Sequence, residues 1–356
     1  MFPLNDASKK RYDAFWNGEV CDRFLTYIAV GSLQSPMPDG MSTAEQTRYK
    51  WENIPYRTQR AVDFYSNARY YLDGFATEFI NFGPGSLAPS IGGNFVFADD
   101  TVWFDRAPVI TDWESPPHIA LDESETLWQK TLAFTDAVLN TDNIYASVAD
   151  LGSALDIVAS LRGTQELLYD FYDYPNEIKE MTARVGVAWK QAFTKLADRI
   201  LARQDGLTSW MPIWCRERYS VLQCDISAML SPDMFLEFAL PDIKDSTEFL
   251  DRSIYHLDGP DAIKHTDALL TLPRLNAIQW MPGAGVPDVT DPTWFELYDK
   301  IQSAGKGLVL FVESPDSLEP LLRHLSPRGV FLSVNCPDDT TAREVTSLIE
   351  GIGVGV

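Results

Sequence analysis

Short apolar runs alternate with longer amphipathic segments along most of the chain. The apolar runs have the length of buried strands, and the stretches between them show the spacing of helices. They begin near residues 24, 76, 144, 209, 253, 277, 307 and 329. Strands that alternate with helices pair in parallel, and about eight of them close the commonest barrel. The pattern therefore predicts an α/β protein, a single (β/α)8 TIM barrel domain over residues 1–356.

Local signals predict additions to this barrel and some helix boundaries. Residues 9–16 have the pattern of a helix, so an N-terminal helical extension precedes the first strand. Two strand-like runs, at 95–97 and 101–104, predict a loop insertion. The helical tract from about 164 to 202 is broken near Pro175, and Ser231 has the character of an N-cap. No GxGxxG lies between the first strand and a helix, which favours the barrel over a dinucleotide-binding sheet.

Composition and charge narrow the classes of partner. Hydrophobic residues make up 45% and charged residues 22% of the chain, as in ordinary globular domains. The formal net charge of −22 repels phosphate backbones and anionic membranes, so we expect no nucleic-acid or membrane partner. No leader-like start is present, and the four cysteines lack CxxC spacing, which together favour a cytoplasmic protein with reduced thiols.

Polar residues directly after the apolar runs are the candidates for chemistry, because the loops after the strands build the site of a β/α barrel. For acid–base work the candidates are Asp100, Asp150 and Asp258, although Asp150 is equally suited to cap the following helix. The candidates for substrate contact lie at strand ends or among nearby aromatic residues and are Asn81, Trp103, Asp225, Gln279, Trp280 and Glu313. Alternatively, Asp225 caps a turn, and Trp103 and Trp280 pack helices against strands.

His256 and Asp258 form the sharpest local feature. Residues i and i+2 of a strand point to the same face, so both side chains are expected at the barrel mouth. Cys336 ends the last apolar run and offers a thiolate, and one His, one carboxylate and one Cys suit catalytic zinc. Zinc would lower the pKa of a substrate thiol. The alternative is a hydrogen-bonded His–Asp pair with Cys336 packed as a small apolar residue.

Three segments resemble the uroporphyrinogen decarboxylase superfamily in order and spacing: the opening helix with Asn17-Gly18-Glu19, residues 161–168, and residues 230–241. The likeness runs over nearly the whole chain and implies a β/α barrel. The decarboxylase branch carries an arginine motif where this chain has residues 31–36 without arginine. Its catalytic aspartate would fall near Asp99 or Asp100, but its substrate-facing tyrosine falls at Ala159.

The methyltransferase branch resembles this chain more closely at the strand ends. It moves methyl groups between corrinoid proteins and thiols such as coenzyme M, or to tetrahydrofolate. Its thiol-using members bind zinc through a His-x-Cys and a later Cys; His256 matches the His, Asp258 replaces the first Cys and Cys336 matches the last. Gln279 stands where a further acidic ligand would fall. The resemblance implies zinc and a corrinoid on a partner carrier protein.

Two enzymatic functions remain open from the sequence, beside a third possibility of a non-catalytic module that binds a corrinoid carrier protein. We expect a methyltransferase that moves a methyl group between a corrinoid or small methyl donor and a thiol or folate acceptor. The alternative is a metal-free decarboxylase or other lyase that acts on a small carboxylated substrate through Asp100, Asp150 and Asp258.

Overall fold

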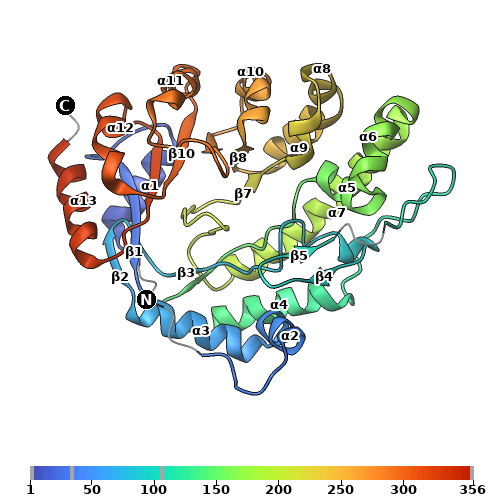
Figure 1. Cartoon of the computed structure of the whole chain (residues 1–356), viewed down its shortest axis with the longest axis horizontal. Coiled ribbons are helices and arrows are strands. Elements are labelled where there is room, and N and C mark those ends of the chain that lie inside the picture. The colour runs from blue at the N-terminus through green and yellow to red at the C-terminus, as the bar shows by residue number, and fades with distance from the viewer. Residues whose placement is uncertain (1–3, 33–35, 105–107, 353–356) are drawn as a thin grey trace.

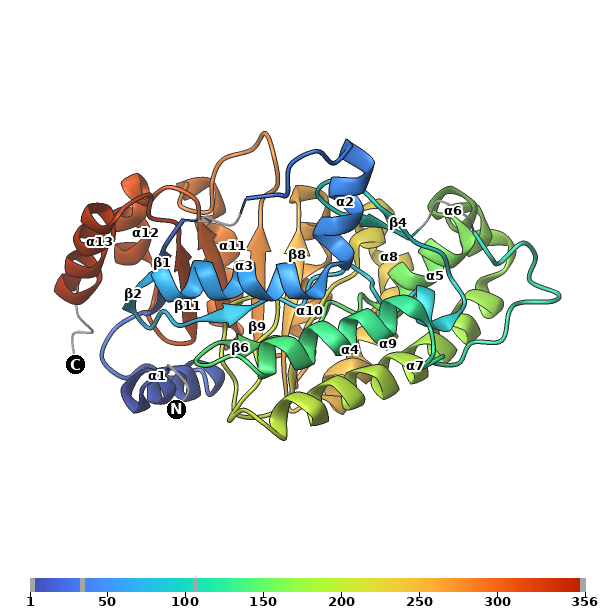
Figure 2. The ribbon, with the colours of Figure 1, turned by 90° about the horizontal axis from the view of Figure 1, so that it is seen from below.

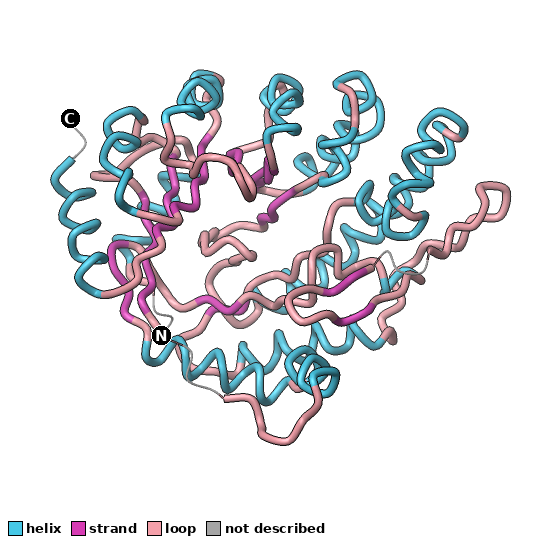
Figure 3. Tube along the Cα trace, in the orientation of Figure 1, coloured by secondary structure: helices cyan, strands magenta, loops and turns pink. Residues whose placement is uncertain are grey.

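The computed structural model describes residues 4–32, 36–104 and 108–352 and has a mixed α/β fold with helices outside the strands (Figure 1). The main sheet has the strand order β2-β1-β11-β10-β9-β8-β7, and every pair in it is parallel except β1 with β2. Its strands are β1 (Leu25–Val30), β2 (Arg69–Leu72), β7 (Tyr219–Leu222), β8 (Arg252–Asp258), β9 (Ala277–Met281), β10 (Gly307–Val312) and β11 (Val330–Val334). Figure 3 shows these strands following a curve.

The first and last parallel strands are neighbours, as in a barrel, but the closed barrel is not confirmed. Within the described part of the chain, β3 (Thr77–Glu78) pairs only with β6 (Tyr145–Ala146), in a separate parallel sheet. Antiparallel β2 occupies the edge of β1 opposite β11, so β3 cannot extend the main sheet there. Near the other edge, Val148 N donates to Thr208 O at 2.9 Å, but no continuous ladder follows.

The strand predicted near residue 209 is wrong. The chain turns back there through an antiparallel bridge between Leu207 and Cys215, and the strand of this region is β7, ten residues later. The other predicted strands from residue 253 onward are confirmed by β8, β9, β10 and β11. The predicted insertion is the antiparallel hairpin of β4 (Val96–Phe97) and β5 (Val102–Trp103).

Helices cover the strands and follow the expected boundaries closely. α6 ends at Asp173 and α7 begins at Pro175, and Ser231 accepts a hydrogen bond from Met234 N at 3.2 Å as an N-cap. Figure 2 shows α3, α4 and α7 side by side along one side of the molecule. The helices are α1 (Asp6–Trp16), α2 (Thr43–Glu52), α3 (Ile54–Asn67), α4 (Thr126–Leu139), α5 (Ala154–Arg162), α6 (Thr164–Asp173), α7 (Pro175–Leu201), α8 (Pro232–Met234), α9 (Leu240–Phe249), α10 (Thr266–Leu270), α11 (Phe295–Ser303), α12 (Leu318–His324) and α13 (Asp339–Ile352).

Among the described helices, none has both the length and the apolar character that crossing a membrane requires. The expected cytoplasmic location and the single domain over residues 1–356 stay predictions.

Candidate functional site

A cleft of about 380 Å³, the main cleft, lies at the carboxyl ends of β8 and β9. It brings together six of the residues predicted from the sequence, from five separate parts of the chain. These six are Asn81, Asp100, Asp150, Asp225, His256 and Asp258. Convergence at the carboxyl ends of parallel strands is the arrangement in which α/β proteins place their sites.

A second cavity of about 300 Å³, the side chamber, adjoins the main cleft. The two cavities share Pro84, Thr101, Gln223 and Asp225 in their walls. Trp103, from the β4–β5 hairpin, lines the side chamber, and the residue is 42% exposed. The insertion therefore contributes residues to both cavities, Asp100 to the main cleft and Trp103 to the side chamber.

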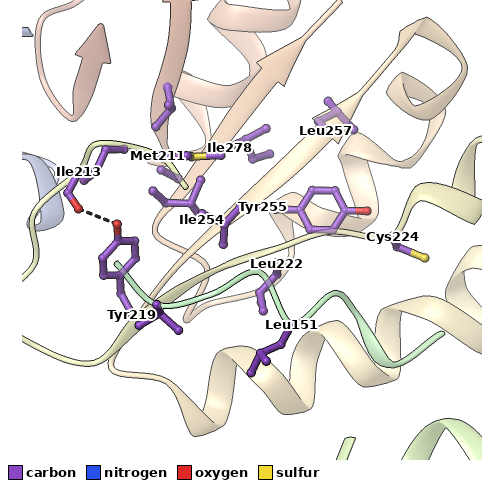
Figure 4. Packing of buried hydrophobic residues seen from close by; sticks show 14 of the residues in the cluster. Leu151, Met211, Ile213, Tyr219, Leu222, Cys224, Ile254, Tyr255, Leu257 and Ile278 are labelled. Atoms are coloured by element: carbon purple, nitrogen blue, oxygen red, sulfur yellow. Dashed lines mark hydrogen bonds between the residues drawn. The ribbon is translucent and has the colours of Figure 1, made fainter. Parts of the chain in front are cut away.

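Apolar neighbours in sequence anchor the site residues. Leu151, Leu222, Cys224 and Tyr255 are all buried and belong to the packed cluster in Figure 4. Each is adjacent in sequence to a polar residue of the main cleft. In extended chain successive side chains point to opposite sides, so anchoring one residue in the core turns its neighbour toward the cleft.

Asp150 is held by a tight turn after β6. Gly152 N donates to Asp150 Oδ1 at 2.9 Å, and Gly152 has a φ of 76°. A Cβ at this glycine would lie 2.6 Å from the Gly85 Cα, so both the conformation and the packing require glycine. Burial raises the pKa of Asp150 to about 6.

Asp156, at the start of α5, positions the segment that carries Asp225. Its carboxylate accepts hydrogen bonds from the backbone N–H groups of Asp225 at 2.9 Å and Ile226 at 3.0 Å. It also accepts one from the Ser153 hydroxyl at 2.8 Å, and burial raises its pKa. Asp156 thus fixes the backbone under Asp225 and places a second carboxyl group beside it.

Asp225 is open to the cleft, yet protein atoms and other carboxyl groups crowd around it. Desolvation by these surroundings, followed by the charges of Asp156 and Asp150, raises the pKa of Asp225 to about 8. The raised pKa favours the protonated form of this side chain, which can donate a proton.

His256 is paired with Gln279 on the neighbouring strand. His256 Nδ1 lies in hydrogen-bond contact with Gln279 Oε1, and because a carbonyl oxygen only accepts, Nδ1 carries the hydrogen. The Trp210 ring meets the imidazole edge to face, with 5.2 Å between the ring centroids. Burial lowers the pKa of His256, so the imidazole is neutral and its Nε2 holds the free lone pair. Such a nitrogen is a general base.

The cleft walls carry negative and neutral groups only. Neither the main cleft nor the side chamber has a Lys or Arg in its described lining. A carboxylate substrate would meet several aspartates with no cation to hold it. The described walls therefore favour a neutral or cationic substrate.

The predicted zinc ligands do not fit a metal site. Cys336 lies outside the described linings of both cavities, so it is not brought to the cleft that His256 and Asp258 line. Across the described ranges no group of three or more His, Cys, Asp or Glu side chains has an arrangement that holds a metal ion. The donor set therefore gives zinc no support.

Three further predicted residues lie away from the cleft. Trp280 points to the face of β9 opposite Gln279 and packs against Trp294, with 4.9 Å between their ring centroids, so it lines neither described cavity. Glu313 is exposed after β10 and contributes to neither described lining. Gln279 is wholly buried and acts through His256, without lining a cavity.

Comparisons with known proteins bear on the fold. No family model matches the chain, and no curated protein matches it. Among solved structures, the chain is similar to a methyltransferase from Methanosarcina mazei, with a TM-score of 0.58 and 10% sequence identity. The match covers 97% of this chain and 98% of that chain. This shows a shared fold. The more specific resemblance to the uroporphyrinogen decarboxylase superfamily stays a prediction.

Sequence reasoning missed several cleft residues. Gln223 follows β7, a strand that the pattern did not reveal, and Trp210 belongs to the segment mistaken for a strand. Asp156 lies three residues after the N-cap Ser153, a spacing that normally marks a helix start and nothing more. Only the contact between α5 and the segment after β7 reveals its second role.

Proposed function

We propose that the chain is a methyltransferase that moves a methyl group from a small neutral donor to a thiol acceptor by acid–base chemistry in the main cleft. One observation carries the proposal: a carboxyl group with a raised pKa, Asp225, and an imidazole with a lowered pKa, His256, line the same cavity. Environments that push two pKa values apart provide an acid and a base at one pH. The fold shared with a protein named a methyltransferase is consistent with this reaction class.

The reaction requires one bond to break and one to form. The donor is a methyl ether or a similar compound, R–O–CH₃, and the acceptor is R′–SH. His256 Nε2 takes the thiol proton, the sulfur attacks the methyl carbon, and the C–O bond breaks while Asp225 gives its proton to the leaving oxygen. The products are R–OH and R′–S–CH₃, and the proton on His256 returns to Asp225 through solvent.

Other cleft residues support these two groups. Asp156 positions Asp225 by accepting its backbone N–H, and Gln279 fixes the imidazole ring so that Nε2 carries the lone pair. Asp150 and Asp258 add to the effect of desolvation and of Asp156, which raise the pKa of Asp225. Trp103 in the side chamber and Asn81 in the main cleft offer an apolar surface and an amide to a bound substrate.

A methyl-transfer assay with labelled donors tests the proposal. The purified protein is incubated with ¹³C-methyl ethers, thioethers and amines, a thiol acceptor and a chelator, and transfer of the label is followed by NMR. Methylcorrinoid as donor and tetrahydrofolate as acceptor are included as separate arms. We expect transfer to the thiol that survives chelation, and a fall in kcat of about 10²–10⁴-fold in Asp225→Asn, the usual contribution of a general acid.

The matched control is Asp233→Asn, an exposed aspartate of α8 outside both described linings, which should leave transfer unchanged. Release of CO₂ from a carboxylated substrate, without methyl transfer, would instead support the metal-free lyase. Full transfer by Asp225→Asn would refute the acid role assigned to this residue.

A further inference from the structure

A third cavity, of about 340 Å³, lies between α2, α3 and the segment around β3 and has the opposite charge character. We call it the basic cavity. Its described lining contains three cations, Lys50, Arg57 and Arg60, and one acid, Glu78. This clustering is unexpected in a chain with 51 acidic and 29 basic residues.

Arg57 is fixed in the wall of the basic cavity by aromatic rings. Its guanidinium carbon lies 4.4 Å from the ring centroid of Phe82 and 4.1 Å from that of Phe134. It donates to the carbonyl oxygens of Trp51 at 3.1 Å and Asn81 at 2.6 Å, which use two of its five N–H donors. Burial lowers its pKa to about 10. Placing a cation here costs free energy, which an anionic partner would offset.

No carboxylate in the described chain lies within 4 Å of the charged atoms of Lys50, Arg57 or Arg60. Lys50 donates to the backbone oxygen of Asp99, and Arg60 packs 5.7 Å from the Tyr56 ring centroid. Most other basic side chains described in this acidic protein do have such partners, as Arg23 has Asp73 and Arg162 has Asp170.

Glu78 does not neutralise this cluster. It is one acid against three cations, and burial raises its pKa to about 7 despite the opposing charge of Arg57. Near neutral pH much of it is protonated, and a protonated carboxyl group donates a hydrogen bond. The basic cavity therefore has a net positive charge.

The remaining walls are mostly aromatic, and two of their residues also line the main cleft. Trp51, Phe64 and Tyr65 line the basic cavity and offer a flat apolar surface. Phe79 and Asn81 line both the basic cavity and the main cleft, so a molecule bound in one lies against the wall of the other. Cations beside aromatic walls suit an anion that carries a short apolar part.

From this arrangement we infer that the basic cavity binds a small organic anion, a carboxylate, sulfonate or phosphate monoester with a short apolar part, held by Lys50, Arg57 and Arg60. Binding does not depend on the proposed function. We further infer that this anion is part of the methyl acceptor. This second step rests on the proposed function, because it places the acceptor at the wall that the basic cavity shares with the main cleft.

Ligand-detected NMR and calorimetry with four matched aromatic probes test the inference. Benzoate, benzenesulfonate and phenyl phosphate distinguish the three anionic groups, and benzylamine is the cationic counterpart of the same size. We expect at least one anion to bind and benzylamine not to compete with it. Arg60→Gln and Lys50→Gln should each weaken anion binding by about tenfold or more, as expected for loss of a charge-assisted hydrogen bond.

The control variant is Arg203→Gln, which removes an exposed arginine that donates to Asn140 and lies outside the basic cavity. It should bind the anions like the wild type. Absence of anion binding by the folded wild type, or undiminished binding in both cavity variants, would overturn the inference. Asp225→Asn should leave anion binding intact, so the inference and the proposed function fail independently.

Discussion

Asp73 and Asp225 are carboxyl groups in opposite surroundings. Asp73 is completely buried and accepts hydrogen bonds from Arg23 at 2.5 and 3.1 Å and from Arg11 at 3.2 Å. Asp225 lies among Asp150, Asp156 and Asp258, and its cleft has no Lys or Arg in the described lining. One region pairs its negative charge with cations, whereas the other gathers negative charge and leaves it unpaired.

The difference separates a structural role from a functional one. A buried carboxylate with two arginines ties distant parts of the chain together, and removing it leaves two cations without a partner. Asp170 is a second paired carboxylate of this structural type. It accepts hydrogen bonds from Arg162 at 2.6 Å and from Trp113 at 2.9 Å. Unpaired acids destabilise one another, and perturbed groups of this kind cluster where chemistry takes place. We therefore assign function to the unpaired region.

We expect the largest effect on stability from removing Asp73, the carboxylate that is paired with arginines. Asp73→Ala should lower the free energy of unfolding by about 3–5 kcal/mol, because Arg11 and Arg23 would lose their buried partner. Chemical denaturation measures the change. Asp22→Ala is the matched control: it removes a second acid from Arg11, but its side chain is 56% exposed, so it should cost about 1 kcal/mol or less. A loss for Asp73→Ala as small as that of the control would remove the basis of the comparison.

The sequence predicted the second half of the fold better than the first. The runs at 307–312 and 329–334 are continuous and apolar because both faces of these strands are covered, and this signal is unambiguous. The run at 209–214 is equally apolar but contains Pro212, which has no N–H for a ladder, and it is a buried loop. Its apolar character reflects burial alone.

The candidate site was predictable where residues directly follow strands. His256 and Asp258 were expected on one face of a strand, and both line the main cleft. Cys336 was expected beside them because it ends the last apolar run, but it lies outside the described linings of both cavities. Asp156 could not be predicted, because its role depends on a contact between a helix and a segment about 70 residues away.

A second prediction converts part of the unpaired region into a paired one. Gln279→Glu would place a carboxylate against His256 Nδ1, and an opposite charge at this distance should raise the imidazole pKa by about 1–3 units. Gln279→Leu removes the hydrogen bond without adding charge and should not raise the pKa. NMR titration of the histidine ring resonances, assigned with His256→Gln among the four histidines, measures both. Equal pKa values in the two variants would show that residue 279 does not contact the imidazole.

The last prediction is a dependence of stability on pH, and its sign differs between the two regions. Asp22, whose pKa is lowered by its hydrogen bond with Arg11, contributes stability that is lost as pH falls below about 4. Asp225 has a raised pKa, so between about pH 4 and about pH 8 the folded state retains a proton that the unfolded state has released. The contribution of Asp225 to stability therefore declines as pH rises through this window.

Asp225→Asn removes this titration, so its stability relative to the wild type should rise from about pH 4 to about pH 8 and then level off. Taking the difference between the two proteins cancels the contributions of groups that titrate in the window without acting on Asp225, such as Glu78 and Asp242. Asp233→Asn, at an exposed position on α8, should show no such trend. Denaturant titrations at several pH values measure the difference. A value that does not change with pH would mean that Asp225 is ionised like an ordinary surface aspartate, which would place it with the solvated acids and not with a reactive cluster.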